Sequence, residues 1–163
     1  MRKRSAIQIG ILSGVIAVGY FVYEGRVSTR RIGPSYGSAP SCRLDIADVS
    51  ANTIKVGIEV SNPTNTPIGI PKRFLPQWGR VYTKLFDVDR NGRVIEFTGR
   101  FIDTKSEDMV QIEPGTAARI KISLTDAGYD VKGRGRFTVT YRTVVWSGGR
   151  AVDCTSNAVV INK

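Results

Sequence analysis

The chain has 163 residues, with 24 Lys and Arg against 14 Asp and Glu, and it contains no histidine. This length suits one domain plus an additional segment, and a hydrophobic content of 41% is enough for a packed core. Without histidine the chain cannot form a Ser-His-Asp triad, a Cys-His pair or a histidine-containing zinc site. The net charge of +10 favours a nucleic acid, an anionic membrane or another acidic partner.

The N-terminal segment has the pattern of a membrane or export signal. Basic residues at positions 2–4 precede residues 5–23, a run of 19 residues without charge, and about 20 apolar residues span a bilayer as a helix. The unbroken apolar run favours an uncleaved anchor. The small residues that end at Gly19 would instead allow a signal peptidase to cleave the chain after Gly19. Gly10 and Gly14 have the GxxxG spacing of helix dimers, which would give a homo-oligomer, although chance glycines in a short apolar run are the favoured explanation.

Residues 24–41 are rich in Gly, Pro and Ser and have no hydrophobic period, which predicts a flexible linker. Residues 42–163 predict an all-β fold, an immunoglobulin-like antiparallel β-sandwich, because short alternating apolar runs are separated by turn signals. The expected strands are residues 43–49, 54–60, 81–88, 94–97, 109–112, 118–124, 137–146, 151–154 and 158–161.

The two cysteines bracket this domain. Cys42 is its first residue, and Cys154 lies near its end. An even number of cysteines behind an export signal favours a disulfide in an oxidising compartment. Two buried free thiols are the alternative.

The order of turns and strands resembles a known accessory domain. The Asn62–Pro67 turn is followed by a hairpin at residues 85–92, a Pro114-Gly115 turn, the segment 122–131 and a strand at 135–141. This order is similar to the non-catalytic β-sandwich ahead of the catalytic domain in deuterolysin-like (M35) metalloendopeptidases. The resemblance extends over about residues 53–143.

The resemblance implies a protein-binding domain without its enzyme. The catalytic part of that family carries a HExxH helix, in which two histidines bind zinc and a glutamate acts as base. This chain has no histidine, so no catalytic residue of the family has a counterpart here. In the family the sandwich shields the protease or assists its folding. We therefore expect a partner protein, no catalytic activity, no metal and no cofactor.

Two acidic groups allow other chemistry. Residues 87–92 resemble the start of a calcium loop, but the twelfth position is Thr98 where an EF-hand has a bidentate glutamate. A hairpin with solvated acids is the favoured interpretation. Asp103, Glu107 and Asp108 could act as paired catalytic carboxylates, although a solvated loop explains them more simply.

The loop at residues 71–79 is the first candidate interaction site, because exposed aromatic side chains together with arginine often anchor protein interfaces. Its candidate contact residues are Lys72, Arg73, Phe74, Leu75 and Trp78. The alternative is that the aromatic side chains fold back and cover one end of the sandwich. Trp146, which precedes the Gly148-Gly149 turn, is open to the same two interpretations.

The second candidate is the glycine-rich basic turn at residues 132–136. Its glycines would let the backbone approach an anionic group, and Arg134 and Arg136 would pair with that group. A solvated turn is the simpler interpretation. Aromatic residues do not alternate with the basic ones, so stacking on nucleic-acid bases is not indicated.

Together these patterns predict a non-catalytic β-sandwich that binds another protein as an accessory, inhibitor-like or chaperone-like subunit. Loop 71–79 and the edge strands are the expected contacts. The predicted location is an inner membrane of the bacterial type with the domain in the periplasm, or outside the cell after signal cleavage. A module for an anionic envelope polymer, such as a polysaccharide or peptidoglycan, is the alternative. Residues 1–41 contain six Lys and Arg and one acid, so the domain itself is only moderately basic and no nucleic-acid partner is expected.

Overall fold

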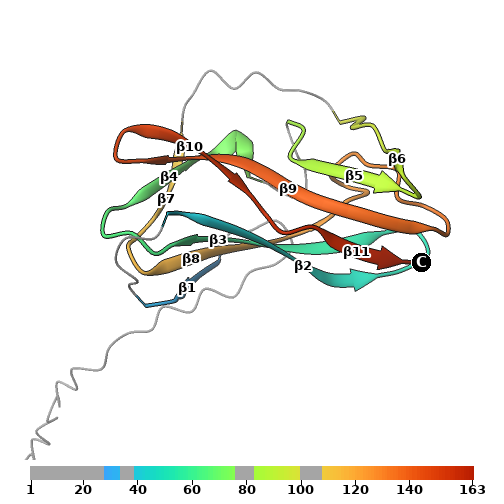
Figure 1. The fold of residues 1–163 in the computed structure, drawn as a ribbon, viewed down its shortest axis with the longest axis horizontal. Coiled ribbons are helices and arrows are strands. Elements are labelled where there is room, and N and C mark those ends of the chain that lie inside the picture. The colour runs from blue at the N-terminus through green and yellow to red at the C-terminus, as the bar shows by residue number, and fades with distance from the viewer. Residues whose placement is uncertain (1–27, 34–38, 76–82, 100–107) are drawn as a thin grey trace, which may run out of the picture.

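The computed structural model describes residues 28–33, 39–75, 83–99 and 108–163 (Figure 1). In this part of the chain two antiparallel sheets face each other around an apolar core, which makes the fold all-β and sandwich-like. The all-β prediction is therefore confirmed. The predicted membrane segment at residues 5–23, including Gly10, Gly14 and Gly19, lies outside the described residues.

The first sheet has the strand order β1-β8-β3-β2. Its strands are β1 (Ser28–Arg31), β8 (Thr116–Ser123), β3 (Ile54–Asn62) and β2 (Ser41–Val49). Strand β3 shows the expected alternation, since Val56 and Ile58 are buried in the core while Lys55 and Glu59 are partly exposed. A β-bulge between Ile46 and Asp48 interrupts the pairing of β2.

The second sheet is organised around β9 (Arg136–Ser147), which is long enough to pair with different strands along its two halves. Its first half pairs with β5 (Phe86–Arg90) and β11 (Val159–Asn162). Its second half pairs with β4 (Ile68–Pro71) and β10 (Arg150–Thr155). The remaining elements of the described chain are β6 (Arg93–Val94), β7 (Met109–Ile112) and the 3-10 helix η1 (Lys72–Phe74).

The predicted linker at residues 24–41 is wrong in its described part. Ser28–Arg31 form β1, which pairs in antiparallel register with β8, and Ser41 already belongs to β2. The sequence of β1 is polar and basic, so it gives no apolar alternation to recognise. The strand forms because the edge of β8 offers unpaired backbone groups that an extended segment can satisfy.

Smaller differences concern the strand boundaries. Strand β4 was not expected, because the short Ile68-Gly69-Ile70 run lies between two prolines. In the described part of the predicted strand 81–88, the structure begins β5 only at Phe86. The predicted strand 94–97 is reduced to Arg93–Val94, because the chain then leaves the sheet edge.

A row of aromatic rings runs through the core. Phe97 lies against Tyr129, Tyr129 against Phe86, and Phe86 against Tyr141, with ring centroids 5.5, 5.9 and 5.6 Å apart. The Tyr129 hydroxyl donates to the carbonyl of Phe86 at 2.8 Å and accepts the Phe86 N–H at 3.1 Å. Burial raises the pKa of Tyr129 to about 12. This tyrosine therefore fixes the β8–β9 connection onto β5.

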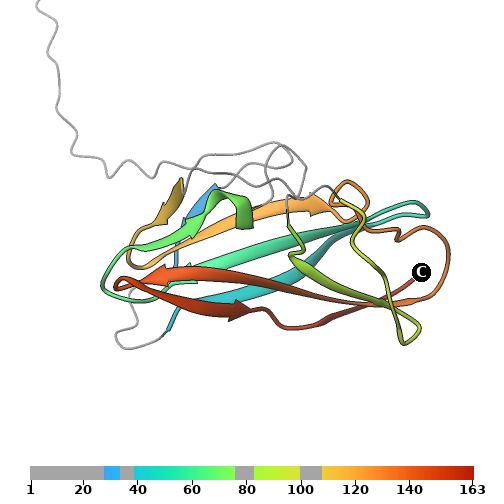
Figure 2. The ribbon, with the colours of Figure 1, turned by 90° about the horizontal axis from the view of Figure 1, so that it is seen from above.

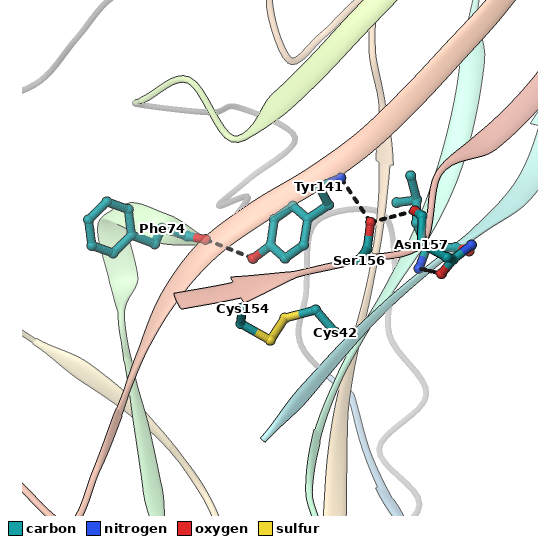
Figure 3. Close-up of a disulfide and its surroundings, with 7 residues drawn as sticks. Cys42, Phe74, Tyr141, Cys154, Ser156 and Asn157 are labelled. Carbon is teal, nitrogen blue, oxygen red and sulfur yellow. Dashed lines mark hydrogen bonds between the residues drawn. A yellow bond between two sulfur atoms is a disulfide. The ribbon is translucent and has the colours of Figure 1, made fainter. Parts of the chain in front are cut away.

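A disulfide and an asparagine join the edges of the two sheets (Figure 3). Cys42 on β2 and Cys154 on β10 form the predicted disulfide, with Cα atoms 5.7 Å apart. The Asn157 side chain donates to the Leu44 carbonyl and accepts the Leu44 N–H, both at 3.0 Å. Asn157 therefore acts as one residue of a neighbouring strand and covers part of the β2 edge. The disulfide is typical of proteins from an oxidising compartment.

Candidate interaction surface

The described part of loop 71–79 is built into the fold. Leu75 is only 1% exposed and belongs to the core. The prediction that Leu75 contacts a partner is therefore corrected, because a side chain buried in the core cannot reach another protein. Trp78 lies outside the described residues.

The three residues of η1 are also held by the sandwich. Phe74 is partly buried against the core, and its carbonyl accepts a hydrogen bond from the Tyr141 hydroxyl at 3.1 Å (Figure 3). The guanidinium carbon of Arg73 lies 5.0 Å from the centre of the Phe74 ring. Lys72 forms an exposed ion pair with Asp108 at 3.1 Å. In this segment Lys72 is exposed and Arg73 is partly exposed, while the apolar side chains mainly pack inward.

The basic turn at residues 132–136 is held in place by an arginine from another strand. Arg90, at the end of β5, donates from Nη1 to the Lys132 carbonyl at 3.2 Å and from Nη2 to the Arg134 carbonyl at 2.7 Å. One guanidinium therefore spans the turn. Its donors are used on backbone oxygens, while the side chains of Lys132, Arg134 and Arg136 remain exposed.

Glycine is required for this arrangement. Gly133 has a φ of +80°, in the left-handed region that other residues rarely adopt. A Cβ at Gly133 would also approach Nη2 of Arg90 to 3.2 Å. The two glycines of the turn therefore allow the backbone to lie close to the arginine that holds it.

The β5–β6 hairpin supports the turn from the other side. Asn91 and Gly92 both have positive φ values, as a type I′ turn requires. Asn91 accepts the Arg136 N–H through Oδ1 at 2.9 Å and donates its own N–H to the Arg136 carbonyl at 2.8 Å. The predicted hairpin is therefore present, and it fixes the start of β9.

The acids of residues 87–92, the segment that resembles the start of a calcium loop, form hydrogen bonds and ion pairs within the protein. Asp89 accepts the Gly92 N–H at 2.7 Å, which closes the hairpin turn. Asp87 accepts from Arg142 at 2.6 Å and lies 3.6 Å from Lys84. Among the earlier candidate carboxylates, Asp108 pairs with Lys72, whereas Asp103 and Glu107 lie outside the described residues.

Lys163, the last residue of the chain, also holds the basic turn at residues 132–136. Its N–H and carbonyl pair with the carbonyl and N–H of Gly135 at 3.0 and 3.1 Å, and its Nζ donates to the Val131 carbonyl at 2.7 Å. Lys163 and Arg90 each lie 5.6 Å from the centre of the Phe137 ring. Desolvation, together with the positive charge of Arg90, lowers the pKa of Lys163.

The β5–β6 hairpin, the turn before β9 and the C-terminus lie at one end of the sandwich, at the right in Figures 1 and 2. The contacts above bring basic side chains together at this end. We call this surface the basic end, and it consists of Arg90, Arg93, Lys132, Arg134, Arg136 and Lys163. Arg90 and Arg93 are direct cross-strand partners. Two like charges directly opposite each other on paired strands destabilise the pairing. In the described part of the chain, the ion pairs do not include any of these six cations. The nearby Asp130 instead accepts the Lys132 N–H. Asp89 and Asp130 offset only part of the charge of the six cations, so the basic end has a net positive charge.

Only part of this surface can be predicted from the sequence. The glycine-rich basic turn indicates Arg134 and Arg136, whereas no sequence pattern indicates Arg90 or Lys163. Arg90 precedes the Asn91-Gly92 hairpin signal, which marks the turn but not what the arginine contacts. Arg90 and Lys163 both donate hydrogen bonds to backbone carbonyls more than 25 positions away, so no local pattern could identify them.

Trp146 lies elsewhere. It is 39% exposed on β9, opposite Gly69 of β4 and Ala151 of β10. Because it is near the far end of β9 from Arg136, it does not contribute to the basic end.

No protein-family model matches this chain, and no curated protein matches its sequence. A solved protein from Archaeoglobus fulgidus is similar over 77% of this chain and 98% of its own, with 10% identity and a TM-score of 0.38. A candidate lipoprotein (ycdA) from Bacillus subtilis is similar over 85% of this chain and 37% of its own, with 11% identity and a TM-score of 0.36. These similarities are too low to support an argument about this chain. Within the described residues, no helix has the length and apolar character needed to cross a bilayer.

Proposed function

We propose that this chain is a non-catalytic domain that binds an acidic protein outside the cytoplasm, and that the basic end makes the contact. The observation that carries this proposal is the net positive charge of the basic end, whose six cations take no part in the ion pairs of the described chain. Like charges held close together cost stability unless an anionic group neutralises them. A partner with surface carboxylates would supply that group.

The geometry supports binding without much rearrangement. Arg90 and Lys163 hold the backbone of the turn, so Lys132, Arg134 and Arg136 project from a fixed frame. A preorganised surface loses less conformational entropy on binding than a flexible loop. Clustered positive charge also accelerates encounter with an acidic partner.

The non-catalytic assignment is part of the same proposal. The chain lacks histidine, the most common general base, and several of its acids are engaged in structural contacts. Asp87 is in ion pairs and Asp89 closes a turn. The raised pKa values of Tyr129 and Tyr141 follow chiefly from burial of their hydroxyls in the core rather than from a reactive cluster.

The proposal keeps the finer expectations from the sequence. It includes an immunoglobulin-like class for the sandwich, a relation to the accessory domain of deuterolysin-like enzymes, and a periplasmic location. Residues 5–23 would anchor the chain in the membrane, with Gly10 and Gly14 available for helix pairing, or would be removed after Gly19. The disulfide supports a location outside the cytoplasm.

An anionic envelope polymer is the second candidate, and the same surface favours it. Arginine side chains recognise carboxylate and phosphate groups of polymers as well as those of proteins. The two candidates differ in stoichiometry and in competition. A polymer would bind many copies along its length and would be displaced by other polyanions, whereas a protein would form a defined complex.

The test is crosslinking of the full-length chain in solubilised membranes, followed by affinity purification and mass spectrometry. Arg134→Gln with Arg136→Gln should remove the captured partner, because both charges face solvent. Lys72→Gln with Arg73→Gln is the matched control, since it removes the same charge from the other candidate loop. We expect the control to retain the partner.

The outcomes separate the alternatives. Equal capture by the wild type and by the Arg134, Arg136 variant would refute the proposed surface. Loss of capture with Phe74→Ala and Trp78→Ala, but not with the arginine variant, would assign the contact to loop 71–79. Recovery of glycan in place of a protein would favour the envelope polymer.

A further inference from the structure

Strand β1 lies very close in sequence to the predicted membrane anchor. It begins at Ser28, five residues after Tyr23, the last residue of the predicted span. Five residues reach at most about 18 Å when fully extended. A sandwich attached through β1 would therefore stay close to the bilayer surface.

The attachment passes through the sheet itself. Four residues of β1 pair in register with β8, from Ser28 opposite Arg119 to Arg31 opposite Thr116. The Ile32 N–H then donates to the Gly115 carbonyl at 2.8 Å. Because β1 is hydrogen-bonded to β8, this edge of the first sheet would be held near the membrane.

The edge carries exposed positive charge. Arg30 and Arg31 on β1, and Lys121 on β8, are exposed, and none of them takes part in the ion pairs of the described chain. Arg119 is different, because it pairs with Glu59. The exposed Glu113, which lies before β8, offsets only part of the charge of these three cations.

We infer that the β1–β8 edge, with Arg30, Arg31 and Lys121, rests on the anionic headgroups of the membrane that holds the anchor. Basic residues beside an anionic bilayer are attracted to it, and each changes the binding equilibrium roughly fivefold. This inference rests on the uncleaved anchor in the proposed function. It does not depend on the partner.

The placement has a consequence for the basic end. In Figures 1 and 2, β1 lies toward the opposite end of the sandwich from the C-terminal residue Lys163. With its β1–β8 edge on the membrane, the domain would keep the basic end away from the tether. The two basic surfaces would then have different roles, one toward lipid and one toward the partner.

The test uses the full-length chain in lipid nanodiscs that contain phosphatidylglycerol and phosphatidylcholine in equal parts, together with a trace of a gadolinium-chelating lipid. The gadolinium at the bilayer surface reduces the intensity of amide NMR signals from residues that lie near the headgroups. We expect the strongest loss at Ser28–Arg31 and Arg119–Lys121, with signals of the turn 132–136 retained. In discs of phosphatidylcholine and the tracer alone, this selectivity should weaken.

Two double variants complete the test. Arg30→Gln with Arg31→Gln should reduce the docking equilibrium roughly 25-fold and weaken the selective loss to the level seen in the neutral discs, where only the tether keeps β1 near the bilayer. Arg134→Gln with Arg136→Gln should leave the loss pattern unchanged. A strongest loss at residues 132–136, a uniform loss, equal patterns in both lipids, or failure of the chain to remain with the discs would each overturn the inference. Partner capture is measured separately, so its success or failure is not confused with these results.

Discussion

The loop at residues 71–75 and the turn at residues 132–136 have similar sequence signals but different positions in the structure. Both contain two or three basic residues, and the sequence predicts a protein contact for the first and a contact with an anionic group for the second. In the first, Leu75 is buried and Phe74 packs against the core. In the second, Arg134 and Arg136 are exposed on a backbone held by Arg90.

The difference follows from the side chains. Leucine and phenylalanine gain free energy from burial whenever the fold offers a site, so their presence in a loop does not indicate an interface. Arginine and lysine side chains keep their charge in water or pair it. Basic residues in a turn therefore remain at the surface, and only their rigidity depends on the rest of the fold.

The largest effect is expected from removal of the disulfide, which lies outside both surfaces. Cys42→Ala with Cys154→Ala should lower the free energy of unfolding by about 4–5 kcal/mol, because the bridge links residues 112 positions apart. Urea denaturation followed by circular dichroism measures this, and the amide NMR signals of residues 132–136 follow the basic end. Since both surfaces belong to one sandwich, we expect them to unfold in the same transition. Unfolding of the basic end at lower urea than the core would contradict this.

Leu75→Ala should have the next largest effect, and it tests whether the loop at residues 71–75 belongs to the core. Loss of a fully buried leucine costs about 2–5 kcal/mol, because it removes apolar burial and leaves a cavity. Lys72→Ala is the control on the same loop, since its exposed ion pair contributes about 0–1 kcal/mol. If both variants were equally stable, Leu75 would have to be exposed in solution, and the loop would return as a candidate interface.

Alkaline pH should lower the free energy of unfolding, because it deprotonates the buried tyrosine hydroxyls that hydrogen-bond near both regions. The pKa of Tyr129 is raised to about 12 in the folded protein, while an unfolded tyrosine titrates near 10. The folded state therefore holds its proton more strongly, so its stability is complete below pH 10 and declines between about pH 10 and 12. Burial also raises the pKa of Tyr141. Free energies of unfolding measured from pH 8 to 11.5 should fall, with a smaller decline for Tyr129→Phe. A profile that stays flat in the wild type would argue against buried hydroxyls.

A smaller cost is expected for Gly133→Ala. The residue would have to adopt a left-handed conformation, which costs about 1 kcal/mol, and its Cβ would press on Arg90. The Arg90 Nε–H signal should shift in NMR spectra, because the guanidinium has to move. An unchanged signal together with unchanged stability would mean that Arg90 does not hold the turn.

The smallest change in stability is expected for Arg134→Gln with Arg136→Gln. Both side chains are exposed, so the free energy of unfolding should change by less than about 0.5 kcal/mol. Thermal denaturation in low and high salt measures this, and relief of repulsion should make the variant slightly less sensitive to salt. Severe destabilisation would show that these charges support the fold rather than a contact.

Much of the fold could be predicted from local patterns. Met109–Ile112 was predicted with the bounds that the structure shows, and β2, β3 and β9 differ from prediction by two residues or fewer at each end. Strands β1 and β4 were missed because their sequences lack an alternating apolar run of useful length. Each is defined by the neighbours with which it pairs.

The candidate surface could be predicted only in part. Arg134 and Arg136 are visible as a basic turn, whereas the contribution of Arg90 depends on carbonyl groups 42 and 44 positions away. Whether Leu75 is buried likewise depends on strands distant in sequence, which form the core around it. In both cases the deciding contacts are long-range.

The sequence by itself determined the strand periods, the glycine turns, the one pairing that a disulfide within the chain could have and the cations that must remain in water. These properties follow from local geometry, from a choice between only two cysteines, and from the solvation of charge. The tertiary structure alone decided that residues 28–31 extend a sheet, that Leu75 enters the core, and that Arg90 and Lys163 fix the basic turn. Those outcomes depend on which surfaces meet when the two sheets pack, and no stretch of residues encodes that meeting separately.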